Sequence, residues 1–195
     1  YKIPDGEGPR VNVQSELTAY NFAGDYTAWF YNGENHNIGP EKLTETDGTR
    51  LPVMTVKAGD KHYMAIHEAC LETGAPLVLQ SKGGESLFSV ASKPTSLSPG
   101  YTSAWRVVLY GTTPGVLTDS HLLELLNPDP DSRYDFSWVK PGLAVWDWRI
   151  NGAVWDGFTY GMSYPSWVRM VDFAAEQGFK YLVLDANWYG PEFES

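Results

Sequence analysis

Two segments in the last third of the 195-residue chain combine carboxylates with tryptophans. Residues 146–149 read Trp-Asp-Trp-Arg, and an apolar run at 181–184 is followed by Asp185, Asn187 and Trp188. Paired carboxylates can break a glycosidic bond, and a flat indole ring matches the apolar face of a pyranose. The sequence therefore predicts a sugar-binding site that contains Asp147, Trp148, Asp185 and Trp188.

The same residues also allow a structural interpretation. Asp147 could form a simple ion pair with Arg149, and Trp146 could fill the protein interior. Asp185 is the stronger candidate, because it directly ends an apolar strand and the carboxyl ends of the strands face the active site in parallel α/β barrels. The residue types alone leave both interpretations open for Asp147 and for the tryptophans.

A second polar cluster occupies residues 29–41, which contain aromatics, amides, one histidine and the acids Glu34 and Glu41. Its spacing matches neither a zinc motif nor an EF-hand loop. Carboxylate and amide oxygens nevertheless suit Ca²⁺. The alternative interpretation of this segment is a hydrated surface loop.

The first 128 residues have the pattern of an all-β sandwich. Short apolar segments alternate with turn signals such as Asn32-Gly33, Asp47-Gly48 and Gly83-Gly84. A helix is expected over 118–126, where a capping threonine precedes apolar residues at helical spacing and Asn127-Pro128 ends them. Strands are expected at 11–15, 25–31, 51–57, 61–68, 76–81, 86–91 and 104–109.

The pattern changes after a polar linker at residues 129–137. In 138–195 a strand at 143–148, a helix at 165–177 ended by Gly178, and a strand at 181–184 form a βαβ unit with parallel strands. Two parallel strands and one helix cannot cover both faces of a sheet, so we expect more sheet beyond this unit. We therefore interpret the chain as a piece of a longer protein, with a sandwich that is incomplete at its N-terminus.

Composition excludes several classes of protein. The chain carries 24 acidic and 14 basic residues, which gives no basic patch for nucleic acid or an anionic membrane. No apolar run is long enough to insert into a membrane, and no Gly-rich phosphate loop or nucleophile elbow is present. A single cysteine, Cys70, excludes a disulfide framework and is expected to be a buried, inert thiol. His67 and Glu68 are expected on opposite faces of a strand edge, with their polar groups satisfied.

Several stretches in order, over roughly residues 20–190, resemble glycoside hydrolase family 97. One of these stretches is the Trp-Asp-Trp strand at 146–148. The other stretches are 66–69, 103–108, 117–120, 125–128, 138–142, 172–175, 178–179 and 184–185.

The resemblance implies an N-terminal β-sandwich, a (β/α)8 catalytic barrel that begins with residues 138–195, and a small C-terminal β-domain. It implies an exo-acting, calcium-dependent α-glycosidase, periplasmic or secreted, that hydrolyses terminal α-galactosidic or α-glucosidic bonds of oligosaccharides. Position matching puts a Ca²⁺-binding glutamate at Glu41, with Glu34 the alternative, and favours sugar contacts for Trp148 and Asp147. The catalytic acid and the nucleophile or base belong to later barrel strands, so no catalytic residue is expected in this chain.

Two other functions are compatible with the residues. The sandwich could be a non-catalytic carbohydrate-binding module with aromatics on an exposed face, or a purely structural domain that touches no ligand. The βαβ unit favours the enzyme, because a binding module has no need for it. No residue pattern points to a particular oligomeric state.

Overall fold

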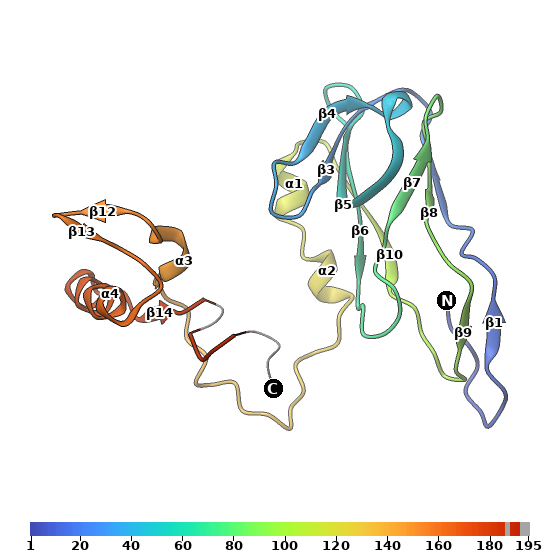
Figure 1. The fold of residues 1–195 in the computed structure, drawn as a ribbon. Coiled ribbons are helices and arrows are strands. Elements are labelled where there is room, and N and C mark those ends of the chain that lie inside the picture. The colour runs from blue at the N-terminus through green and yellow to red at the C-terminus, as the bar shows by residue number, and fades with distance from the viewer. Residues whose placement is uncertain (186–187, 192–195) are drawn as a thin grey trace. The chain divides into compact units, whose positions relative to one another are not determined.

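A computed structural model describes residues 1–185 and 188–191 of the chain. The chain divides into two compact units, residues 1–130 and 131–195, each of which is described by itself (Figure 1). In the described residues no helix is both long and apolar enough to cross a membrane.

The first unit is built of short strands, which confirms a mainly β fold. All seven predicted strands are present with shifted ends, and three further strands (β2, β4 and β9) were not predicted. The strands are β1 (Val11–Val13), β2 (Ala19–Asn21), β3 (Thr27–Tyr31), β4 (Ile38–Lys42), β5 (Asp47–Lys57), β6 (Tyr63–Ala69), β7 (Leu79–Lys82), β8 (Leu87–Val90), β9 (Thr95–Leu97) and β10 (Trp105–Gly111).

Strand β5 is long enough to take part in both halves of one curled sheet. The strand order is β10-β6-β5-β7-β8-β2. Strand β3 also pairs with β5, and β4 pairs with β3. Residues 47–50 of β5 pair with β7, whereas residues 54–57 pair with β6. Between these stretches, Pro52 and Val53 have no partner on β3, since Tyr31 pairs with Leu51 and Phe30 with Met54. This β-bulge bends the strand, as bulges do, and turns the sheet back on itself.

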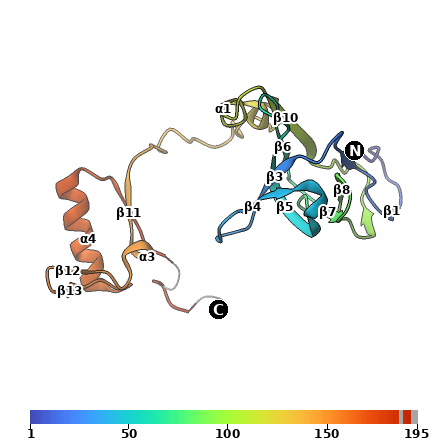
Figure 2. The ribbon, with the colours of Figure 1, turned by 90° about the horizontal axis from the view of Figure 1, so that it is seen from above.

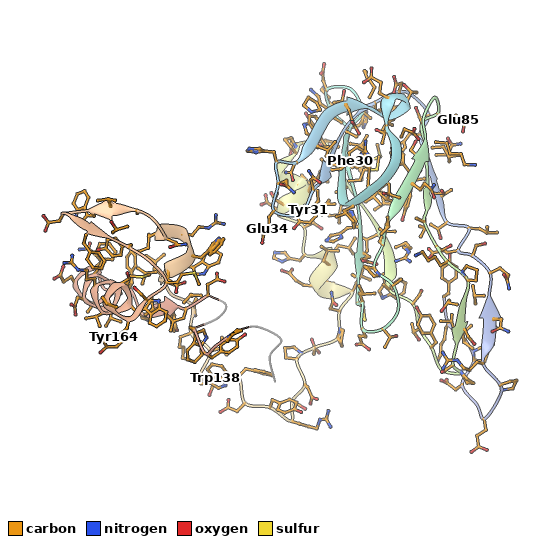
Figure 3. The ribbon with its side chains drawn as sticks, in the orientation of Figure 1. Phe30, Tyr31, Glu34, Glu85, Trp138 and Tyr164 are labelled. Atoms are coloured by element: carbon orange, nitrogen blue, oxygen red, sulfur yellow. The ribbon has the colours of Figure 1, made fainter. Side chains whose placement is uncertain are left out.

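The curl encloses an apolar core. The rings of Phe30 and Phe88 lie 5.8 Å apart between their centroids, although β3 and β8 are not neighbours in the sheet. Phe30 accordingly lies inside the unit in Figure 3. Met54, Val56 and Leu79 fill the same core and are fully buried.

Two short helices cover the outer face of β6 and β10. They are α1 (Gly115–Thr118) and α2 (Leu122–Leu125), so the single helix predicted over 118–126 is wrong. The break falls at 119–121, where the Ser120 hydroxyl accepts a hydrogen bond from the Leu122 N–H and competes with the helical pattern. The helices pack leucines against Ala65, Ala69, Val107 and Leu109.

The neighbourhood of β6 differs from the sequence predictions in three respects. The strand lies between β5 and β10 and is not an edge. Glu68 is satisfied, but in the described part of the chain the buried Nδ1 of His67 has no hydrogen-bond partner. Cys70 is half-buried and not fully buried, because it follows the end of β6 and turns the chain with a φ of 56°.

The second unit contains the predicted βαβ arrangement. Strands β11 (Ala144–Trp146) and β14 (Tyr181–Val183) are parallel and adjacent, and α4 (Tyr164–Gln177) connects them. Gly178 ends the helix in the left-handed conformation, with a φ of 72°. Figure 2 shows α4 running beside β11, and the two elements are in contact.

The first strand of this unit is shorter than predicted. It ends at Trp146, and Asp147 and Trp148 begin the short helix α3 (Asp147–Ile150). A hairpin of β12 (Val154–Trp155) and β13 (Phe158–Thr159), which was not predicted, follows before α4.

An ion-pair network holds distant parts of the first unit together. The Arg106 guanidinium donates to Glu16 at 2.7 Å and to Glu68 at 2.9 Å, and Glu68 also accepts the backbone N–H of Leu77 at 2.8 Å. The side chains of the three charged residues are no more than 16% exposed. The hydrogen bond from Arg106 lowers the pKa of the Glu16 carboxyl below its ordinary value of 4.5.

This network predicts an acid-sensitive contribution to stability. Because the folded pKa of Glu16 is lowered, its stabilisation is fully present above pH 4.5 and is lost as the pH falls through the folded pKa. We expect Arg106→Met to lower the free energy of unfolding by about 3 kcal/mol at pH 7, because it leaves two carboxylates without their cation. Urea unfolding of wild type, Arg106→Met and Glu16→Gln at pH 7 and pH 3 measures this. A Glu16→Gln deficit that is equally large at both pH values would contradict the assignment.

Candidate functional site

The carboxyl ends of β11 and β14 lie side by side and carry the predicted site residues of the second unit. Trp146 pairs with Val183 in the parallel register, so the residues that follow both strands emerge at one edge. The Asp147 Oδ1 atom accepts the backbone N–H of Asp185 at 2.9 Å. The structure therefore brings these two predicted residues together.

Asp147 is fully buried and both of its carboxylate oxygens are occupied. Its Oδ2 atom accepts the indole N–H of Trp167 at 2.8 Å, which ties α4 to the end of β11. It forms no ion pair with Arg149, whose guanidinium instead lies 5.0 Å from the centroid of the Trp146 ring. In this geometry Asp147 positions the strand ends, and its direct contact with sugar stays a prediction.

Asp185 has a more open environment. It is half-buried, and its Oδ2 atom accepts the Trp146 indole N–H at 2.7 Å. Trp148 follows Trp146 by two residues and Trp188 follows Asp185 by three, and both tryptophans are more than half exposed. Asn187 lies outside the described residues. The strand edge thus presents one carboxylate held by an indole, and two exposed indoles.

The β12–β13 hairpin adds residues to this edge that the sequence predictions missed. It lies in the connection between the carboxyl end of β11 and the start of α4, and its turn has positive φ at both Asp156 and Gly157. An Asp-Gly pair between apolar residues is a strong hairpin signal and could have revealed it. The Arg169 guanidinium lies 4.1 Å from the centroid of the Phe158 ring and fixes the hairpin on α4, while Trp155 remains exposed.

The two candidate metal ligands of the first unit lie in different surroundings. Glu41 is in β4, and its Oε1 atom accepts hydrogen bonds from the Thr46 hydroxyl at 2.8 Å and from Arg50 at 3.2 Å. Glu34 is exposed in the loop between β3 and β4, and its carboxylate has no partner among the described residues (Figure 3). No cluster of three or more His, Cys, Asp or Glu side chains suited to a metal occurs in residues 1–185 and 188–191.

The chain consists of a curled β-sandwich followed by a parallel βαβ unit. Comparison with known proteins identifies the family to which it belongs. Residues 1–128 match the family model described as Glycosyl-hydrolase 97 N-terminal. The chain therefore belongs to glycoside hydrolase family 97, and its first 128 residues correspond to the N-terminal domain of that family.

Two curated relatives are α-galactosidases by name. The chain is 28% identical over 193 residues to a retaining alpha-galactosidase of Bacteroides thetaiotaomicron, with 85% of this chain and 29% of the relative covered. It is 29% identical over 209 residues to a probable retaining alpha-galactosidase of Streptomyces bingchenggensis, with 97% of this chain and 29% of the relative covered. The chain thus spans less than a third of the length of these relatives.

Solved structures of the same family have the same fold. A family 97 enzyme of Pseudoalteromonas sp. strain K8 in complex with acarbose superposes with a TM-score of 0.76 at 25% identity. The match covers 97% of this chain and 31% of that one. A variant of the same enzyme in complex with panose gives the same values.

The buried carboxylate of Asp147 predicts a stability effect that an exposed acid would not have. We expect Asp147→Ala to lower the free energy of unfolding by about 2–4 kcal/mol, because the Trp167 indole and the Asp185 amide lose charged acceptors. Urea unfolding measures the stability, and hydrogen exchange of the Asp185 amide reports the lost bond directly. Asp172→Ala, an exposed acid on α4, is the matched control and should change stability by less than about 0.5 kcal/mol. Unchanged protection of the Asp185 amide in Asp147→Ala would contradict the positioning role.

Proposed function

We propose that the protein carrying this chain is an exo-acting α-glycosidase that hydrolyses terminal α-galactosidic or α-glucosidic bonds. The observation that carries the proposal is the edge formed by the ends of β11 and β14, where Asp185 accepts a hydrogen bond from the Trp146 indole in a family 97 chain. The names of the two curated relatives favour the galactoside, whereas the acarbose and panose complexes of the Pseudoalteromonas enzyme support binding of α-linked glucose oligosaccharides.

The proposal gives the residues at this edge different tasks. The half-buried Asp185 carboxylate accepts hydrogen bonds from sugar hydroxyls, and a charged acceptor makes such bonds stronger than a neutral one. Trp148 and Trp188 supply flat apolar surface for the pyranose ring. Asp147 acts through Asp185, whose backbone amide it holds.

No residue of this chain is assigned as the general acid or as the nucleophile. The chain covers 29% of the curated relatives, and the proposal assigns both groups to the remaining part of the protein. The contribution of these 195 residues is therefore to bind and orient the sugar, which lowers the barrier by positioning.

The proposal includes Ca²⁺, with Glu34 as the ligand that this chain provides. Glu34 has an exposed carboxylate without a partner in the described residues, in a loop that also holds the amide oxygens of Asn32 and Asn35. Glu41 fits less well, because the cation Arg50 already occupies one of its oxygens. These residues fit one part of a Ca²⁺ coordination shell and not a complete site. When bound, Ca²⁺ would orient sugar hydroxyls and polarise the groups beside it.

The proposed activity predicts turnover of simple aryl glycosides. The full-length protein should hydrolyse an aryl α-galactoside, an aryl α-glucoside or both with Ca²⁺ present, and Asp185→Asn should lower kcat/KM about 10- to 100-fold, since one charge-assisted hydrogen bond weakens. Asp172→Asn is the control and should leave kcat/KM unchanged. Absence of turnover of both substrates by a folded, Ca²⁺-loaded sample would refute the proposal.

The proposed Ca²⁺ site predicts that activity depends on the metal and that Ca²⁺ affinity depends on the Glu34 carboxylate. Excess chelator should abolish activity, and Glu34→Gln should weaken Ca²⁺ affinity at least about tenfold, because a charged ligand becomes neutral. Calorimetric Ca²⁺ titration of the full-length protein reads the affinity without activity. Glu41→Gln is the comparison, and it should lower stability while leaving Ca²⁺ affinity near wild type. If Glu41→Gln weakens Ca²⁺ binding and Glu34→Gln does not, the ligand is Glu41. If activity survives excess chelator, Ca²⁺ has no part in the mechanism.

A further inference from the structure

The outer face of the sandwich contains an open pocket that the proposed function does not use. It has a volume of about 430 Å³ and lies within the first unit. Its lining comes from strands β3 and β5 and from the loop that precedes β4: Trp29, Phe30, Tyr31, Pro52, Val53, Thr55 and Asn37.

Two irregularities in strand pairing create this hollow. On one side of β3, Pro52 and Val53 form the bulge of β5 opposite Tyr31. On the other side, the register with β4 shifts beside Trp29, between the pairs Ala28–Glu41 and Phe30–Ile38. Bulges bend a strand and re-aim its side chains, so this short segment of β3 is flanked by two such distortions.

Gly39 allows the second distortion. Its φ is 115°, and a Cβ atom placed there would lie 2.6 Å from the Ala28 carbonyl oxygen and 3.1 Å from Cδ1 of the Trp29 ring. Only a residue without a side chain fits at this position of β4, against the Ala28 carbonyl and the Trp29 ring. The indole of Trp29 is therefore held against the backbone at a fixed position.

The pocket combines flat apolar surface with hydrogen-bonding groups that have no protein partner. Within the described residues, the Trp29 indole N–H, the Tyr31 hydroxyl, the Asn37 amide and the Thr55 hydroxyl form no hydrogen bond to another protein group. Tyr31 is 48% exposed, so its ring is accessible. This mixture suits a ligand that has an apolar face and many hydroxyls.

The lack of charged residues in the pocket restricts the charge of its ligand. None of its lining residues is acidic or basic, and the chain as a whole carries a net charge of −10. An anionic ligand such as a phosphate would find no cation here, and a cationic ligand would find no carboxylate. The open shape suits part of a longer molecule and not a fully enclosed small one.

We propose that this pocket binds a neutral oligosaccharide, with one pyranose ring on the Trp29 and Tyr31 rings and its hydroxyls on Asn37 and Thr55. This inference goes beyond the proposed hydrolysis, because it concerns binding by the sandwich itself. It assigns a sugar to β3 and β5, whereas the residues proposed to contact the sugar during hydrolysis follow β11 and β14.

The test measures binding of panose and raffinose, two neutral trisaccharides, to the 195-residue chain by calorimetry and ligand-observed NMR. We expect a dissociation constant on the order of 1 mM for one of them, as is typical of a few stacking and hydrogen-bonding contacts. Tyr31→Ala should weaken binding about fivefold or more, and Asn37→Ala should also weaken it. Circular dichroism and thermal unfolding check the fold of each variant.

Two controls separate this site from others. Tyr110→Ala removes a tyrosine that is 55% exposed on β10 of the same unit, and it should leave the affinity unchanged. Trp148→Ala tests whether the measured binding comes from the edge used by the proposed function. If Trp148→Ala abolishes the binding and the pocket variants do not, the proposal is overturned. If Tyr31→Ala fails to fold, Asn37→Ala and Thr55→Val decide. The proposal is overturned if the wild-type chain does not bind either sugar at a concentration 50-fold above the expected dissociation constant. It is also overturned if the pocket variants bind as tightly as wild type. Both outcomes are independent of whether the full-length protein hydrolyses glycosides.

Discussion

The sandwich depends on one constraint, which is that β5 must belong to both halves of a single sheet. A flat strand of eleven residues would extend the sheet and expose both of its faces to water. The bulge at Pro52 and Val53 removes this difficulty, because it separates the residues that pair with β7 from those that pair with β6. The two halves can then close over Phe30 and Phe88 and bury one shared apolar core. The same bulge hollows the opposite face beside Tyr31, so the device that closes the core also forms the pocket.

In the second unit, a buried carboxylate has the corresponding role. Burial of an ionised group is costly unless its oxygens are hydrogen-bonded, and Asp147 meets this condition through Trp167 and the Asp185 amide. Each partner comes from a different element, so the bonds form only when β11, α4 and β14 are packed together. The carboxylate thus specifies the arrangement of the βαβ unit, and Asp185 receives a fixed position as a consequence.

Much of the fold could be predicted from the sequence, because its signals are local. Turn residues between short apolar segments revealed seven strands of the sandwich, and Gly178 marked the end of α4. The strands that were missed, β2, β4 and β9, have three to five residues each and lack regular alternation. Strand β4 even contains Gly39 and Pro40, which argue against a strand in sequence terms. Pairing with β3 overrides that local preference. A local sequence pattern does not reveal such a pairing between strands.

The candidate site illustrates a different limit. Asp147 and Asp185 each follow an apolar segment and lie within three residues of a tryptophan, and the sequence favours Asp185 only because it directly ends its strand. Their environments differ because β11 ends at Trp146 and the chain turns at once into α3, which carries the Asp147 side chain into the interior. Asp185 lies two residues after the end of β14 and is only half-buried. The point at which β11 ends and α3 begins therefore decides which acid is buried and which acid can meet a ligand. The indole of Trp167 on α4, twenty residues further along the chain, donates a hydrogen bond to the buried acid and holds it there.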